Sequence, residues 1–83
     1  MLQLKIVSPE KIEFDGAVEN VLVPGTMGQF EILTDHAPII STLQCGVVEY
    51  STATEKNSLE IMGGFVEVQK NVVSLCVELK AKE

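Results

Sequence analysis

The stretch "LEIMGGFVEVQKNVVSLCVEL", residues 59–79, decides the fold. Its apolar residues change parity at the glycine pair Gly63-Gly64, with Leu59 and Ile61 before it and Val66 and Val68 after it. Side chains alternate between the two faces of a strand, so both pairs can face one core only if an extra residue sits at the glycines. A glycine-bearing β-bulge supplies that residue. The stretch therefore predicts a bent strand over residues 59–69.

A short turn follows the bent strand. Lys70-Asn71 reads as a hairpin loop, and residues 72–79 alternate again. The apolar face of this run holds Val73, Leu75, Val77 and Leu79, and the other face holds Ser74, Cys76 and Glu78. Strict alternation is typical of a strand with one face on a core and one face in water. The run therefore predicts a second strand that pairs with the first.

The rest of the chain has the same period of two. Alternating runs occupy residues 2–7, 11–14, 18–23, 30–33 and 47–50. Turn residues separate them: Ser8-Pro9, Asp15-Gly16 and Pro24-Gly25. Asp-Gly supplies the positive φ of a tight hairpin, so we expect the chain to reverse at Asp15-Gly16. No segment shows the apolar spacing of an amphipathic helix.

These runs predict an all-β fold, a small flattened β-sandwich or barrel of about eight to ten short strands. With 83 residues, the chain has the length of one domain, residues 1–83. The last residues, 79–83, are mostly polar and are expected to form a frayed tail.

The charge and cysteine content restrict the function. The formal net charge is -6, from twelve acidic and six basic residues, which argues against nucleic acid and against direct adhesion to anionic lipid. No signal peptide and no apolar run of about 20 residues is visible, so we expect a cytosolic or peripheral protein without direct membrane insertion. Cys45 and Cys76 lack the spacing of a zinc or redox motif and are expected to be free thiols.

His36 is the only histidine and the first candidate for a catalytic residue. A general base needs a proton donor or a nucleophile close by, and the sequence offers only Asp35 beside it and Cys45 as the nearest thiol. We prefer a loop histidine that satisfies backbone groups or meets a partner. The carboxylates are scattered over the outward positions of strands. We therefore expect no catalytic residue, no metal and no cofactor, and a function that lies in a surface.

Several short motifs follow one another in a fixed order. They read "PGTMGQF" (24–30), "HAPII" (36–40), "GVV" (46–48), "GGFVEVQ" (63–69) and "NVV" (71–73), after "VSPE" (7–10) and "FDG" (14–16). In order and spacing they resemble the N-terminal β-domain of the epsilon subunit of bacterial F-type ATP synthases, called delta in mitochondria. The chain departs from that family at Glu31 and Asp35, where glycine is usual, and at Gln29, where many relatives are acidic.

The resemblance implies a non-catalytic rotor subunit of the central stalk, which docks on the gamma subunit and the c-ring and couples proton flow to ATP synthesis. Such a subunit is peripheral on the cytoplasmic face of the bacterial plasma membrane. By position in the family, the expected c-ring contacts are Thr26, Met27, Gln29 and His36. The expected gamma-subunit contacts are Ser8, Ser41 and Leu43.

The family commonly continues into a C-terminal hairpin of two helices, which in many members restrains ATP hydrolysis. The sequence stops where that hairpin would start, so we expect no helical hairpin and no restraint of this kind. A ligand- or carbohydrate-binding β-sandwich is the alternative from another class. It would need a concave patch with exposed aromatic residues, and the chain offers only Tyr50 and three phenylalanines, Phe14, Phe30 and Phe65. We expect these phenylalanines mostly at strand ends or facing inward.

Overall fold

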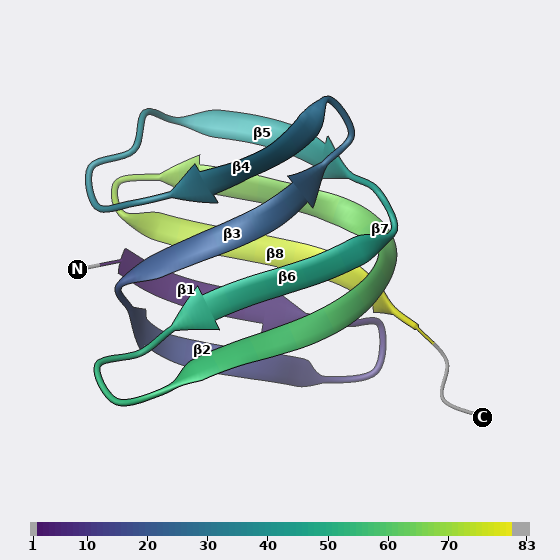
Figure 1. Ribbon diagram of the computed structural model, residues 1–83, viewed down its shortest axis with the longest axis horizontal. Coiled ribbons are helices and arrows are strands. Elements are labelled where there is room, and N and C mark those ends of the chain that lie inside the picture. Colours follow the sequence, from purple (N-terminus) through teal and green to yellow (C-terminus); the bar gives the residue numbers. More distant parts are fainter. Residues whose placement is uncertain (1, 81–83) are drawn as a thin grey trace.

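The computed structural model describes residues 2–80, and eight β-strands and no helix occur within that range (Figure 1). The predicted all-β fold is confirmed. The domain is flattened, with extents of 37 × 29 × 19 Å. The strands are β1 (Leu2–Val7), β2 (Ile12–Val18), β3 (Asn20–Gly25), β4 (Gly28–Ile32), β5 (Ile39–Leu43), β6 (Gly46–Ser51), β7 (Lys56–Gln69) and β8 (Val72–Leu79).

The strands form two packed layers that share β7. The first half of β7 pairs with β6, which pairs with β3, which pairs with β4; we call this the four-strand layer. The second half of β7 lies between β5 and β8, and β1 and β2 follow; we call this the five-strand layer. Among the strands of residues 2–80, only β1 and β8 pair in parallel. In Figure 1, β3 and β6 lie in front of β1 and β8.

The core lies between the two layers. Alternate side chains of both layers point into it, as the period of two predicts. Val, Ile and Leu fill it without a buried charge. Its buried members are Leu2, Leu4, Ile6, Val18, Val21, Val23, Ile32, Leu43, Val48, Ile61, Val66, Val68, Val73, Leu75 and Val77.

The bend in β7 joins the two layers. The pairing of β7 with β8 shifts register between Ile61 and Gly63, so the predicted bulge is confirmed. Gly64 has φ 148°, and a Cβ there would collide with the Cys76 carbonyl oxygen. Glycine is therefore required where β7 passes close to β8. The extra residue lets Ile61 and Val66 face one core from the two halves of the strand.

Two predicted turns had different outcomes. Lys70 and Asn71 form the β7–β8 hairpin turn with φ 50° and 62°, which confirms that prediction. The predicted reversal at Asp15-Gly16 is wrong, because β2 continues through both residues. The chain reverses earlier, where the Ser8 amide donates to the Lys11 carbonyl oxygen at 2.9 Å. In β2, the missing side chain of Gly16 leaves room for the ring of Phe14.

Leu79, which was predicted to begin a frayed tail, is part of a strand. Leu79 is the last residue of β8, where it pairs with Ile61 and packs against the core. The Lys80 amide also donates to the Glu60 carbonyl oxygen at 3.4 Å. Leu79 therefore belongs to β8, because it has both a strand partner and a contact with the core. Residues 81–83 lie outside the described residues.

Candidate functional site

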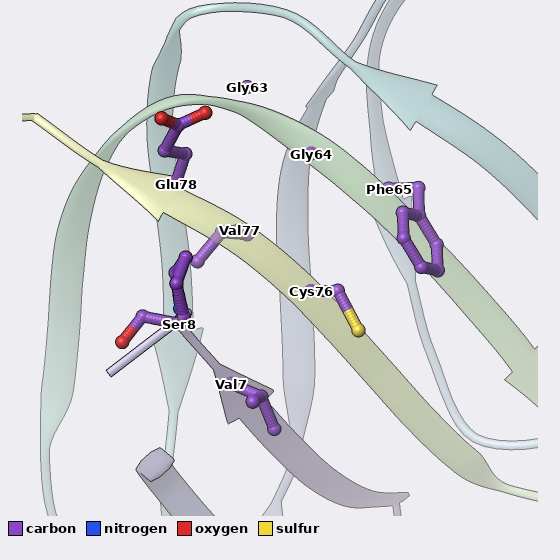
Figure 2. A pocket seen from close by; sticks show the side chains of 9 residues that line it. Val7, Ser8, Gly63, Gly64, Phe65, Cys76, Val77 and Glu78 are labelled. Atoms are coloured by element: carbon purple, nitrogen blue, oxygen red, sulfur yellow. The ribbon is translucent and has the colours of Figure 1, made fainter. Parts of the chain in front are cut away.

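An apolar row crosses the outer face of the five-strand layer. Val7 pairs with Ile12 on one side and with Cys76 on the other, and Cys76 pairs with Phe65. Ile12 and Phe65 are 55% and 47% exposed. Figure 2 shows the side chains of Val7, Cys76 and Phe65 projecting to one side from three neighbouring strands. We call Ile12, Val7, Cys76 and Phe65 the apolar stripe.

A shallow hollow of about 440 Å³ lies beside the stripe, where β1 and β8 end and β7 bends (Figure 2). Phe65 and Cys76 line it, together with Gly63 and Gly64, which contribute no side chain. Ser8 and Glu78 are polar residues of its lining. An open hollow with an apolar wall suits a protruding side chain of a protein partner better than a small ligand that needs enclosure.

The three residues expected to contact gamma have different environments. Ser8 is 8% exposed, and its hydroxyl oxygen accepts from the Lys11 amide at 3.3 Å. The same hydroxyl can donate to Glu13 Oε2 at 2.9 Å or to the Lys11 carbonyl oxygen at 3.2 Å, so it is satisfied within its own turn. Ser41 is half-buried on β5, and Leu43 is a core residue with 5% exposure. Of the three, only Ser8 lines the hollow.

The four residues expected to contact the c-ring lie along one edge of the sandwich. Thr26 and Met27 form the β3–β4 turn, and Met27 is 98% exposed. Gln29 follows on β4, and His36 lies in the β4–β5 loop. The turn and the loop sit at opposite ends of β4 (Figure 1). The four expected contact residues therefore belong to β4 and to the two connections that flank it.

The β3–β4 turn is held against β5. The Thr26 amide donates to the Thr42 carbonyl oxygen at 3.1 Å, and the two hydroxyl oxygens lie 2.9 Å apart. A Cβ at Gly25 would collide with the Gly28 carbonyl oxygen and with the ring of Phe30. The residues that surround Met27 therefore fix where it projects.

One ring nitrogen of His36 is bound within its own loop. Its Nδ1 lies 2.7 Å from the Ala37 carbonyl oxygen, which can only accept, so Nδ1 carries the hydrogen and Nε2 is left for another partner. Cys45 lies in the β5–β6 loop, at the other end of β5, which rules out a Cys-His pair. Within residues 2–80, no group of three or more His, Cys, Asp or Glu side chains could hold a metal ion.

The aromatic residues give little support to a carbohydrate site. The rings of Tyr50 and Phe14 contact each other in a tilted arrangement with centroids 4.6 Å apart, and both pack against the core. Phe30 also packs against the core. Phe65 was expected at a strand end or inward, but it lies outward at 47% exposure because the bulge changes the parity of β7. One exposed aromatic side chain does not make a stacking platform.

The apolar stripe is the feature that sequence reasoning missed. Val7 and Cys76 are neighbours only because β1 and β8 are parallel, a pairing between the two ends of the chain. The parity change at Gly63-Gly64 was a signal for the outward position of Phe65. No local signal was available for Val7 and Ile12, because their shared face depends on the register shift between β1 and β2.

Comparison with known proteins identifies the family. The model for the beta-sandwich domain of the ATP synthase Delta/Epsilon chain matches residues 1–80. The chain belongs to this family. It is 40% identical over 77 residues to the ATP synthase epsilon chain of Leptospira borgpetersenii, and 38% identical over 76 residues to that of Rippkaea orientalis. These matches cover 93% and 92% of the chain but 61% and 56% of the relatives, so the chain spans somewhat more than half of their length.

Two solved structures contain chains with the same fold. A chain of the mitochondrial ATP synthase of Euglena gracilis superposes with a TM-score of 0.86 at 20% identity, covering 92% of this chain and 49% of that one. A chain of the Tetrahymena thermophila central stalk and c-ring gives 0.79 at 16% identity, covering 93% and 63%. Between residues 2 and 80, the structure contains no helix long and apolar enough to cross a membrane.

Proposed function

We propose that this chain is a non-catalytic rotor subunit of the central stalk of an F-type ATP synthase, which docks on the gamma subunit and the c-ring and couples proton flow to ATP synthesis. Membership of the delta/epsilon family supports this function. The relatives at 38–40% identity are named ATP synthase epsilon chain, and one similar structure is described as central stalk and c-ring. In the complex, the subunit is peripheral on the cytoplasmic face of the bacterial plasma membrane.

The single observation that carries the proposal is the apolar stripe with its hollow. Four strands place Ile12, Val7, Cys76 and Phe65 side by side on a face that a free domain would gain nothing by exposing. An apolar row beside a hollow is typical of the centre of a protein interface, where buried aromatic anchors supply most of the affinity. We assign this face to gamma. Ser8 lines the hollow, and Ser41 and Leu43 lie on β5, which pairs with the second half of β7.

The c-ring would meet the edge formed by β4, its turn and its loop. Met27 offers an exposed apolar side chain, Gln29 a neutral amide and His36 a free ring nitrogen. Contacts of this kind are individually modest. The gamma interface therefore supplies most of the affinity, and a standard interface buries on the order of 1,600 Å² in total.

The experiment is a titration of the purified chain with the cognate gamma subunit. We expect Phe65→Ala to raise the dissociation constant by about tenfold to a hundredfold, because truncation of an aromatic anchor typically costs about 1–3 kcal/mol. Val47→Ala is the matched control: Val47 is 42% exposed, and it lies on β6 in the other layer.

An equal loss of affinity in Phe65→Ala and Val47→Ala would contradict the assignment of the stripe. Failure of the unmodified chain to bind gamma at all, under conditions where the rest of the complex assembles, would contradict the proposed function itself.

A further inference from the structure

Two side chains from distant parts of the sequence join the β4–β5 loop to the β7–β8 turn. The Asp35 amide donates to Asn71 Oδ1 at 2.6 Å, and Asn71 Nδ2 donates to Asp35 Oδ1 at 3.1 Å. The two residues therefore exchange a reciprocal pair of hydrogen bonds. The Asn71 side chain is used at both its oxygen and its nitrogen, which fixes its orientation.

Asn71 is also anchored through its backbone. Its carbonyl oxygen accepts from the Gln3 amide at 2.9 Å, which ties the β7–β8 turn to the start of β1. Asn71 thus connects three segments: the loop that carries His36, the turn before β8, and β1. Strands β1 and β8 carry Val7 and Cys76 of the apolar stripe.

The backbone at both positions is special. Asp35 has φ 65° and Asn71 has φ 62°, in the left-handed region that Asp and Asn tolerate better than most residues. Among residues 2–80, the loop between β4 and β5 makes one hydrogen bond between backbone groups, from the His36 amide to the Leu33 carbonyl oxygen at 3.1 Å. The side-chain pair is thus the link that ties the loop to the five-strand layer beyond its own ends.

We propose that Asp35 and Asn71 form a clamp that positions His36 and transmits load from the β4–β5 loop directly into β1 and β8. The inference rests on the proposed function, because a fixed position of His36 matters only if His36 contacts the c-ring. Without the clamp, force at the loop would reach the apolar stripe only through the strands that flank the loop, β4 and β5. With it, the loop is also tied through Asn71 to the starts of β1 and β8, the strands that carry Val7 and Cys76 farther along.

The clamp is tested first in the full 83-residue chain, without any other subunit. Asn71→Gly removes both side-chain hydrogen bonds and keeps a residue suited to the left-handed turn position. We expect the Asp35 amide to exchange with solvent about three- to tenfold faster, as the loss of a typical hydrogen bond predicts, with a change in the ring signals of His36. The Thr26 amide, at the other end of β4, is the control and should not change.

A swap of the two side chains separates the clamp from a general effect on stability. Asn71→Asp alone places two carboxylates together and should release the loop, whereas Asp35→Asn combined with Asn71→Asp restores one donor and one acceptor. We expect the double variant to recover the slow exchange of residue 35 and the ring signals of His36. Fast exchange in the double variant, or slow exchange in Asn71→Gly, would overturn the clamp.

The positioning role is tested separately in the assembled rotor. We expect Asn71→Gly to weaken cross-linking of residue 36 to the c-ring by about threefold or more, with gamma binding unchanged. Unchanged cross-linking in a variant whose loop is released in solution would overturn the positioning role alone. Loss of gamma binding in the unmodified chain would instead count against the proposed function.

Discussion

Lys70 is the residue whose backbone conformation suits its side chain least. It occupies the first central position of the β7–β8 turn with φ 50°, which costs an ordinary L-residue roughly 1–2 kcal/mol. Asn tolerates this region because its short amide can bond locally. We expect Lys70→Asn to raise the free energy of unfolding by about 0.5–1 kcal/mol, measured by urea denaturation. Lys70→Ala is the control, and an equal gain there would show that the backbone conformation is not the cause.

We expect Tyr50 to make the folded chain less stable at alkaline pH. Burial raises its pKa above the ordinary value near 10, and the nearby carboxylates of Glu13 and Glu55 raise it further. Between the ordinary and the raised pKa, the folded chain keeps a phenol proton that the unfolded chain has lost. The folded state binds more protons in this window, so stability falls as the pH rises through it, and the contribution is complete below about pH 10.

The measurement for Tyr50 is urea denaturation at pH values from about 8 to 11, in the unmodified chain and in Tyr50→Phe. We expect the unmodified chain to lose more stability above about pH 10 than the variant does, since phenylalanine has no proton to lose. Parallel curves for the two chains would refute the role of Tyr50.

Among the elements, the bend of β7 gives the sharpest contrast between two neighbouring residues. At Gly64 a Cβ would collide with the Cys76 carbonyl oxygen, whereas at Gly63 the nearest atom, the Leu43 carbonyl oxygen, would be 3.5 Å away. We expect Gly64→Ala to lower the free energy of unfolding by about 2–4 kcal/mol, because it combines steric overlap with a left-handed backbone. Gly63→Ala should change it by less than about 1 kcal/mol.

Both glycine variants are compared by thermal and urea unfolding. If the Gly64→Ala chain were as stable as the Gly63→Ala chain, β7 and β8 could move apart at the bend without a loss of stability. That result would contradict the requirement for glycine at residue 64.

The elements also show how far local sequence signals reach. The parity change at Gly63-Gly64 predicted the bulge because a strand must keep its apolar side chains on one face. The predicted reversal at Asp15-Gly16 was wrong because this dipeptide can occur in a turn or within a strand. Here it lies within a strand, where glycine makes room for the Phe14 ring. Turn chemistry alone does not separate these cases, since the choice depends on packing against residues elsewhere in the chain.

The candidate site depended on contacts at longer range. The c-ring contacts were expected through the family resemblance, and the turn and loop that carry them follow from glycine, proline and aspartate at fixed positions. The apolar stripe required the parallel pairing of β1 with β8 and the register shift between β1 and β2. No local periodicity encodes either feature, so Val7 and Ile12 did not stand out from the sequence.

At the scale of the whole molecule, the two proposed docking surfaces lie on different sides of a flat sandwich. The apolar stripe covers the outer face of the five-strand layer, and the expected c-ring contacts follow the edge formed by β4 (Figure 1). A domain of two packed β-sheet layers resists deformation between these two surfaces, because both layers share one packed core. The shape therefore suits a part that holds two partners at a fixed angle.

The measurement that tests the central claim most directly is the alkylation rate of Cys76, which lies in the apolar stripe and is partly exposed. A Cys45→Ser variant leaves Cys76 as the single thiol. We predict that an excess of gamma slows its alkylation by about tenfold or more, and that Phe65→Ala in the same background reduces this protection at equal concentrations. Alkylation of Cys76 at the same rate in the free chain and in the gamma complex would contradict the account.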